Sequence, residues 1–187
     1  MRTRIHRESS NSLGDQLNEI IAKVSFGGDE VDITDITFYT RDLRFKCQRC
    51  ALLCCRLGGP PLSQNDIDRV RRAGYNPVEF SEFTSTERFK LPKVRQRVMR
   101  SREDGSCIFL KNGRERGTHE CSIYDHRPAL CRLYPFYSEM VNSSSFLLKV
   151  IPCCKGLNDP DAEVVDERFF FRHLHEAIVE ILVDNPS

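Results

Sequence analysis

The stretch Cys47-Gln48-Arg49-Cys50-Ala51-Leu52-Leu53-Cys54-Cys55 holds four of the nine cysteines of this chain. The two-residue gap between Cys47 and Cys50 lets a tight turn aim two sulfurs at one metal ion, as in zinc ribbons and ferredoxin-type clusters. Two further cysteines follow at once, which favours a metal site over a simple redox dithiol. The stretch therefore predicts a fold organised around a metal ion or an iron–sulfur cluster.

Cys54 and Cys55 are adjacent, and neighbouring side chains of an extended chain point to opposite faces. Both can serve one centre only where the backbone bends between them. The simpler expectation is that one faces a first centre, while the other faces a second centre or the core. A buried cysteine with a purely structural role is the alternative for either residue.

The other five cysteines each follow a turn or loop signal and do not fit a periodic core pattern. They are Cys107 after Asp104-Gly105, Cys121 after a polar loop, Cys131 after Pro128, and Cys153 and Cys154 after Pro152. We expect folding to bring these segments to the 47–55 stretch. An odd number of cysteines cannot pair off completely, and structural disulfides are uncommon in the reducing cytosol, so the count favours metal ligation.

The composition is that of a soluble globular domain. The chain has 187 residues, a net charge of +1, 40% hydrophobic residues and 29% charged residues. These values give no general electrostatic reason to bind nucleic acid or an anionic membrane. No apolar run follows the basic N-terminus, and no stretch approaches the roughly 18 apolar residues of a membrane span. We therefore predict a single cytoplasmic domain over residues 1–187 with no membrane segment.

Hydrophobic spacing predicts an amphipathic helix near each end of the chain, at about 12–25 and 161–183. Between them, Ser63-Gln64-Asn65-Asp66 resembles a capping box, with Gly74 as the helix stop, and Asn76-Pro77 begins a short helical turn. Asp125 is a candidate cap for a brief helix that runs to Arg132.

Alternating apolar residues predict a short strand or hairpin within 31–46 and a strand at 146–150. Asp104-Gly105 predicts a hairpin with strands at about 95–102 and 106–111. The expected class is α+β: short strands, hairpins and cysteine-bearing turns around a metal centre, with helices at both ends.

From Phe45 to Leu157 the chain resembles the YkgJ-like cysteine-cluster family, whose domain is described as zinc- or iron-chelating. Three elements carry the resemblance. They are Cys47, Cys50, Cys54 and Cys55 with Arg56; Cys107-Ile108-Phe109-Leu110; and Cys121-Ser122-Ile123-Tyr124-Asp125-His126-Arg127-Pro128-Ala129-Leu130-Cys131-Arg132-Leu133-Tyr134-Pro135-Phe136. We take residues 45–157 as the family-like core.

The chain departs from the family pattern at two places. Ala51-Leu52-Leu53 stands where the family has two residues beginning with glycine, and Cys153-Cys154-Lys155-Gly156 replaces a Cys-Pro-Gly element, with Cys153 as the extra cysteine. The resemblance implies eight metal ligands, enough for two four-thiolate sites or for one site with spare thiols. They are Cys47, Cys50, Cys54, Cys55, Cys107, Cys121, Cys131 and Cys154. His119 or His126 is an alternative fourth ligand.

The apolar Leu52 and Leu53 favour an iron–sulfur cluster, of the four-iron type, and Zn²⁺ is the alternative. Four thiolates around a divalent ion leave a charge of about −2, which requires compensation when partly buried. Guanidinium groups suit that role, because they stay ionised and offer several donors. The arginines next to the cysteines are Arg49, Arg56, Arg127 and Arg132.

Two other functions remain open, and the sequence does not decide whether the chain is an enzyme. Relatives of the family include flagellin lysine N-methylases, so the resemblance also admits an S-adenosylmethionine-dependent methyltransferase. The basic run at 88–102, which contains no acid, admits a metal-stapled module that binds nucleic acid or another acidic partner.

Overall fold

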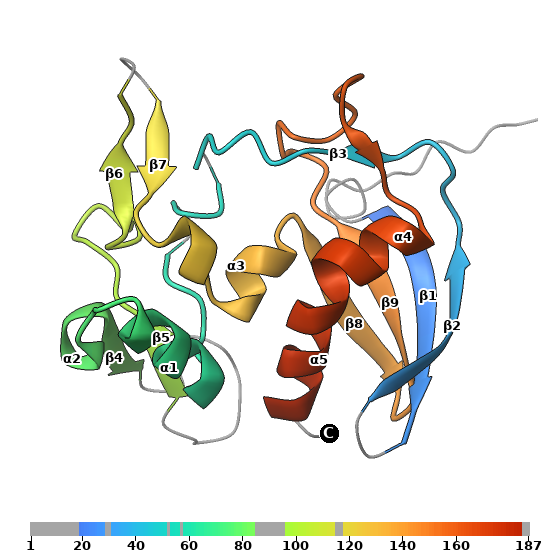
Figure 1. Cartoon of the computed structure of the whole chain (residues 1–187), viewed down its shortest axis with the longest axis horizontal. Coiled ribbons are helices and arrows are strands. Elements are labelled where there is room, and N and C mark those ends of the chain that lie inside the picture. Colours follow the sequence, from blue (N-terminus) through green and yellow to red (C-terminus); the bar gives the residue numbers. More distant parts are fainter. Residues whose placement is uncertain are drawn as a thin grey trace, which may run out of the picture.

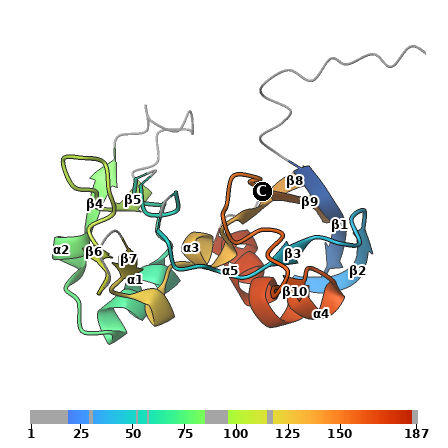
Figure 2. The ribbon, with the colours of Figure 1, turned by 90° about the horizontal axis from the view of Figure 1, so that it is seen from above.

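The computed structural model describes residues 19–28, 31–51, 53–56, 58–84, 96–114 and 118–184. The described residues form two lobes joined by α3 (Ala129–Leu133) and by the segment that follows β3 (Arg44–Phe45), as Figures 1 and 2 show. We call them the sheet lobe and the cysteine lobe. Strands and helices occur in both, and the α+β prediction is confirmed. Within these segments, no helix combines the length and apolar character needed to cross a bilayer.

The sheet lobe is a four-stranded antiparallel sheet with the C-terminal helices packed on it (Figure 1). The strand order is β2-β1-β9-β8, with β1 (Glu19–Gly27), β2 (Asp32–Phe38), β8 (Phe136–Asn142) and β9 (Ser145–Val150). The helical run consists of α4 (Glu167–Phe169), the wider π-helical turn η4 (Phe170–Leu174) and α5 (His175–Asp184). Its core includes the fully buried Phe146, Leu148, Phe170 and Ile178.

The prediction of an N-terminal helix at 12–25 is wrong for residues 19–25, which lie in β1, while residues 12–18 lie outside the described part of the chain. β1 is paired on both sides, with β2 and with β9. The register shifts between Ile20 and Ala22, so Ile21, Ala22 and Val24 are all buried although they do not alternate. Because of this β-bulge, the buried apolar residues of the strand do not alternate, and their spacing in the sequence resembles that of an amphipathic helix.

The C-terminal helix was predicted from about 161, but the helical run begins at Glu167. Residues 163–164 form the short strand β10 (Glu163–Val164), which pairs with β3. The side chain of Asp166 then accepts a hydrogen bond from the Phe169 amide and caps the run, which defines its start.

The cysteine lobe contains two short helices and two small antiparallel ribbons. They are α1 (Gln64–Arg72), α2 (Pro77–Phe80), β4 (Ser81–Thr84) with β5 (Gln96–Met99), and β6 (Leu110–Asn112) with β7 (His119–Cys121). The capping box is confirmed, because Ser63 and Asp66 each accept from the other's amide at 3.0 and 3.2 Å. Among the described residues, eight buried side chains form the core of this lobe, against fifteen in the sheet lobe.

The predicted hairpin at Asp104-Gly105 is only partly correct. The turn is present, because the Arg102 amide donates to the carbonyl of Ser106, and Ser101 bridges to Cys107. However, β5 pairs with β4, and β6 pairs with β7. The helix expected after Asp125 also differs: residues 124–126 form the 3₁₀ turn η3 (Tyr124–His126), and α3 begins only after Pro128.

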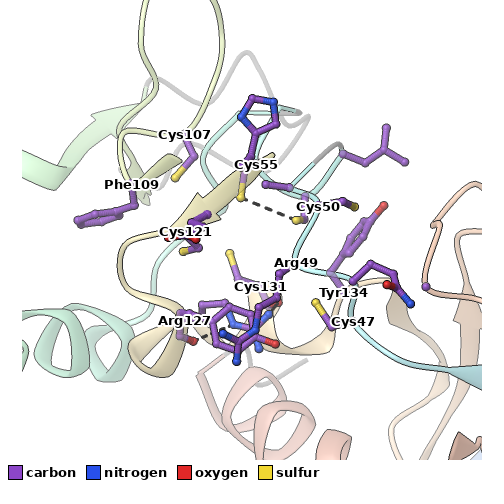
Figure 3. Close-up of a pocket in the computed structure, with 18 of the residues that line it drawn as sticks. Cys47, Arg49, Cys50, Cys55, Cys107, Phe109, Cys121, Arg127, Cys131 and Tyr134 are labelled. Carbon is purple, nitrogen blue, oxygen red and sulfur yellow. Dashed lines mark hydrogen bonds between the residues drawn. The ribbon is translucent and has the colours of Figure 1, made fainter. Parts of the chain in front are cut away.

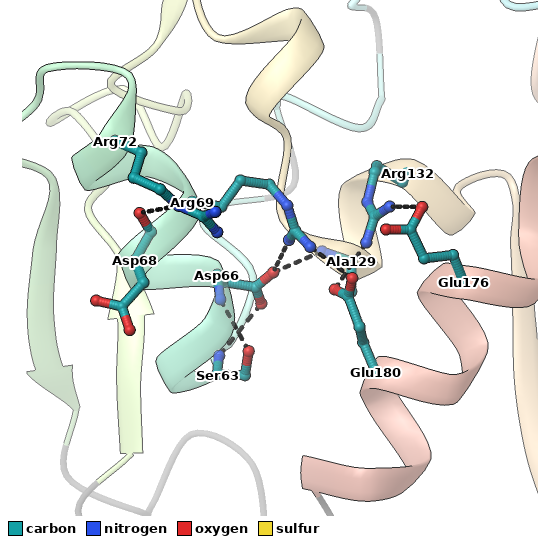
Figure 4. Close-up of polar contacts among 9 residues, drawn as sticks. All are labelled: Ser63, Asp66, Asp68, Arg69, Arg72, Ala129, Arg132, Glu176 and Glu180. Atoms are coloured by element: carbon teal, nitrogen blue, oxygen red, sulfur yellow. Dashed lines mark hydrogen bonds and ion pairs between the residues drawn. The ribbon is translucent and has the colours of Figure 1, made fainter. Parts of the chain in front are cut away.

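A polar network joins the two lobes through α3 (Figure 4). Asp66 of α1 accepts a hydrogen bond from the Ala129 amide at 2.8 Å and pairs with Arg69. Arg69 also pairs with Glu180 of α5, and Arg132 of α3 pairs with Glu180 at 2.7 Å. Consequently α3, which carries Cys131, is bonded to α1 of the cysteine lobe and to α5 of the sheet lobe.

Candidate metal centre

All nine cysteines line one cavity of about 850 Å³. They come from segments far apart in the sequence: the 47–55 stretch, the turn before β6, the end of β7, α3, and the turn after β9. Figure 3 shows the labelled cysteines around this space. All nine are free thiols. The structure therefore brings the eight predicted ligands and Cys153 to one place, while their role as ligands stays a prediction.

The 47–55 stretch reaches the cavity in an irregular conformation. Arg49 and Ala51 both have φ of +49°, a left-handed conformation that favours glycine. The Arg56 amide donates to the carbonyl of Leu53, and this turn brings the sulfurs of Cys54 and Cys55 to 3.8 Å from one another. The backbone thus bends so that both thiols face the same side.

Three cysteines meet the 54–55 turn from the rest of the cysteine lobe and α3. The Cys107 amide donates to the carbonyl of Cys55 at 2.8 Å, so these two segments of the chain are in direct contact. Cys121 ends β7 in register with Leu110, and Cys131 lies within α3. Figure 3 shows the sulfurs of Cys55, Cys107, Cys121 and Cys131 around a common space.

Cys153 and Cys154 arrive from the sheet lobe. Behind them, the Lys46 amide donates to the carbonyl of Gly156 at 2.9 Å, and Gln48 donates to Asp159 at 2.7 Å. These bonds lay the turn after β9 beside the start of the cysteine stretch. Cys153 is exposed, whereas Cys154 is half-buried.

Gly156 permits this close approach, because a Cβ there would lie 2.3 Å from the carbonyl oxygen of Lys46. We expect Gly156→Ala to lower the free energy of unfolding by about 1–3 kcal/mol, since backbone must move to admit the methyl group. Gly27→Ala is the matched control, because its Cβ would meet nothing nearer than Thr34 at 3.9 Å. Denaturant unfolding of both variants checks this. Equal stability of the two would contradict it.

The electrostatics of the cavity favour thiolates at two positions. The Cys55 thiol donates to Cys54, and this bond, aided by the charge of Arg127, lowers the pKa of Cys54 to about 7 against the effect of burial. Interactions with Cys55, the Ile123 backbone and Arg127 likewise lower the pKa of Cys121 to about 7 against the effect of burial. The interactions with Cys121 and Cys54 raise the pKa of Cys55.

The pKa values of the two more deeply buried thiols are raised. Burial is the main cause that raises the pKa of Cys131, and the neighbouring thiols Cys107 and Cys121 add to it. Burial likewise raises the pKa of Cys107. Metal binding must displace the protons of these two thiols, so their ionisation depends on the charge that the metal brings.

Arg127 is the cation best placed to offset thiolate charge. Its guanidinium donates to the carbonyls of Tyr124 and Cys131, and it stacks on the Tyr124 ring at 3.9 Å. Arg49 stacks on the same ring at 4.1 Å and also lines the cavity.

The other two arginines that the sequence suggested for this role lie elsewhere. Arg132 points to α5, where it pairs with Glu176 and Glu180, so its expected role at the cysteines is wrong. Arg56 donates to Nε2 of His119 at 3.1 Å in an exposed position.

Two cavity residues have buried polar atoms without a hydrogen-bond partner in the described part of the chain. They are the hydroxyl of Tyr134, which the sequence reasoning missed, and Nδ1 of His119. Tyr134 lines the same cavity as Cys54, Cys153 and Cys154. An O–H group among sulfurs is a fitting donor to metal-bound thiolates. His126 does not line the cavity.

As described, the chain has no group of three or more His, Cys, Asp or Glu side chains close enough to hold one metal ion. The sulfurs share a cavity but do not converge on one point. The donor set nevertheless fits a thiolate-bound metal, because soft sulfur ligands are combined with nearby cations and free polar hydrogens.

The basic run at 88–102 gives no support to a binding surface in its described portion, and residues 88–95 lie outside the described residues. Arg97 stacks on Phe83, and Arg100 pairs with Glu82 at 3.7 Å. Arg102 donates to the carbonyls of residues 108 and 110. These three arginines thus serve contacts within the lobe.

Residues 46–155 match the family CxxCxxCC, described as "Putative zinc- or iron-chelating domain". An uncharacterized protein of Methanocaldococcus jannaschii, MJ0661, is 28% identical over 148 residues, which cover 73% of this chain and 70% of the relative. No solved structure matches the chain. The family match spans more than half of the chain and contains all nine cysteines. The chain therefore belongs to the CxxCxxCC family, the cysteine-cluster family that its motifs resemble.

Proposed function

We propose that this chain is a cytoplasmic metal-binding protein that holds an iron–sulfur centre through cysteine thiolates at the junction of its two lobes. The observation that carries the proposal is the single cavity lined by all nine cysteines. Eight of them are the proposed ligands, and they are Cys47, Cys50, Cys54, Cys55, Cys107, Cys121, Cys131 and Cys154.

The spacing of the sulfurs supports a cluster over a single zinc ion. A zinc ion bonded at about 2.3 Å requires its sulfurs within about 4 Å of one another. The sulfurs of Cys54 and Cys55 meet this condition at 3.8 Å, but the described residues contain no set of three that could hold one ion. A cluster bridges a wider gap, because its irons and sulfides occupy the space between the thiolates.

The surrounding residues are suited to hold such a centre. Four basic residues line the cavity, and among the described residues Glu120 is the single acid that does so, so the lining compensates thiolate charge. The basic residues are Arg49, Arg114, Arg127 and Lys155. When bound, an iron–sulfur cluster would supply one-electron redox chemistry. Apolar neighbours such as Ile123 and Phe109 restrict water at the inner wall.

Anaerobic purification followed by iron, sulfide and zinc analysis and a visible absorption spectrum tests the proposal. We expect a brown protein with iron and acid-labile sulfide in equal amounts. A colourless protein with stoichiometric zinc would replace the cluster by a zinc site and keep the thiolate ligands. A protein without either metal would overturn the proposal.

Removal of the cavity cation should change the pH at which the centre is lost. Protons compete with the metal for thiolates, so the centre is released as the pH falls through the pKa values of its ligands. Arg127 lowers the pKa of Cys54 and Cys121. In Arg127→Gln those pKa values rise, and we expect release at a pH about 0.5–1 unit higher than in the wild type, with about 10–100-fold weaker metal binding.

The measurement is visible absorbance, or zinc release to a chromogenic dye, during stepwise acidification. Arg71→Gln is the matched control, because Arg71 lies on α1 with 64% of its side chain exposed and pairs only with Asp68 among the described contacts. Identical release curves for the two variants would show that Arg127 does not act on the thiolates.

A further inference from the structure

We propose that eight of the nine cysteines form two separate metal centres, an inner centre within the cysteine lobe and an outer centre that joins the two lobes. The inference rests on the proposed function and adds the number of centres and the assignment of each ligand. The inner ligands are Cys55, Cys107, Cys121 and Cys131, and the outer ligands are Cys47, Cys50, Cys54 and Cys154.

The inner group is defined by direct contacts. The Cys107 amide donates to the carbonyl of Cys55, and Cys121 lies opposite Leu110 on the β6–β7 ribbon that follows Cys107. Cys131 lies in α3 and lines the same cavity. These four sulfurs surround one space in Figure 3, on the side of the cavity that carries Phe109. Four thiolates complete the usual ligand set of a zinc ion or a cubane cluster.

The outer group lies where the cysteine stretch meets the sheet lobe. Cys154 of the turn after β9 lines the same cavity as Cys47 and Cys50 of the cysteine stretch. One hydrogen bond, from the Lys46 amide to the Gly156 carbonyl at 2.9 Å, fixes this approach. In Figure 3 the sulfur of Cys47 lies apart from the four inner sulfurs.

Cys54 and Cys153 are the two candidates for the fourth outer ligand. The inner group already has four sulfurs, whereas the outer group has three. The sulfur of Cys54 lies at the edge of the inner group, 3.8 Å from that of Cys55, and Cys54 is half-buried. Cys153 is exposed. We therefore assign Cys54 to the outer centre and leave Cys153 without a metal.

The stacked side chains of Arg49, Tyr124 and Arg127 suit a position between two anionic centres. Arg49 lies between Cys47 and Cys50 of the outer group in the sequence, while Arg127 donates to the carbonyl of Cys131 in the inner group. Both guanidinium groups lie about 4 Å from the Tyr124 ring, at 4.1 and 3.9 Å. Two positive charges there reduce the repulsion between two centres that each carry a charge of about −2.

The test compares Cys50→Ser, Cys107→Ser and the control Cys153→Ser, each purified without oxygen and analysed for iron, sulfide and zinc per chain. We expect each of the first two variants to retain about half of the wild-type metal, and the control to retain all of it. Complete loss in both Cys50→Ser and Cys107→Ser would overturn the two-centre assignment in favour of one shared centre. A wild-type protein without metal would instead overturn the proposed function itself.

Thiol alkylation of the metal-loaded wild type gives an answer even where a variant fails to fold. Cys47 and Cys153 are both exposed in the structure, so accessibility alone makes both reactive. We expect mass spectrometry to find Cys153 modified and Cys47 protected until a chelator is added. Modification of Cys47 in the loaded protein would overturn the outer centre, and protection of Cys153 would overturn the choice of Cys54 as its ligand.

Discussion

Stripping the metal from the native protein with a strong chelator should lower the midpoint of thermal unfolding by roughly 20 °C or more. A structural metal contributes on the order of 10 kcal/mol to folding, because the ligand set does not exist in the unfolded chain. For a chain of this size each kcal/mol corresponds to about 2–4 °C. Cys131→Ser should show a similar loss together with reduced metal content.

The cysteine lobe should account for most of this loss. Its ribbons have only two strands each, and isolated two-stranded ribbons are marginal in water. Its described core has eight buried side chains, and small cores commonly require a crosslink or a metal. The sheet lobe has a four-stranded sheet and the larger core, so it depends less on the centre.

Hydrogen exchange with and without the chelator locates the effect. We expect amides of α1, β5 and β7 to lose protection, while those of β1 and β9 keep most of theirs. An unchanged unfolding midpoint after complete metal removal would show that the centre does not stabilise the fold. Cys153→Ser serves as the control for the loss of a thiol that binds no metal.

Features that depend on neighbouring residues were predictable from the sequence. The start of α1 follows from Ser63 and Asp66, three residues apart, because the capping box is made within one turn. The turn at Asp104-Gly105 was also predictable, because its hydrogen bonds join residues only three or four positions apart. The placement of each cysteine beside a turn signal likewise indicated that the segments meet, and one cavity contains them all.

Features that depend on distant partners were not predictable. β1 carries apolar residues at helical spacing, and only its pairing with β2 and β9 makes it a strand. The strand after the Asp104-Gly105 turn pairs with β7, across a loop whose length gives no pairing signal. Arg132 follows Cys131 directly, but the helical geometry of α3 turns it towards α5. The position of Arg132 next to Cys131 in the sequence therefore led to a wrong prediction, because its guanidinium pairs with α5 and not with the cysteines.

Asp66→Ala should lower the free energy of unfolding by about 3 kcal/mol, which corresponds to a fall of about 6–12 °C in the unfolding midpoint. Asp66 is 3% exposed, and its carboxylate receives the amides of Ser63 and Ala129 and the guanidinium of Arg69. The first amide starts α1, and the second starts α3, whose N-cap Pro128 offers no side-chain acceptor. One buried carboxylate thus caps two helices from different parts of the chain.

The alanine variant would leave two amides and one guanidinium short of an acceptor, and each buried donor without a partner costs about 1–3 kcal/mol. Asp68→Ala is the matched control on the same helix, because Asp68 pairs at 3.0 Å with a largely exposed Arg71, a kind of pair worth at most about 1 kcal/mol. Denaturant unfolding of the metal-loaded variants measures both changes. Equal losses at positions 66 and 68 would mean that the Asp66 carboxylate does not bind α1 to α3. Because α3 carries Cys131, we also expect Asp66→Ala, but not Asp68→Ala, to release metal at lower denaturant concentration than the wild type.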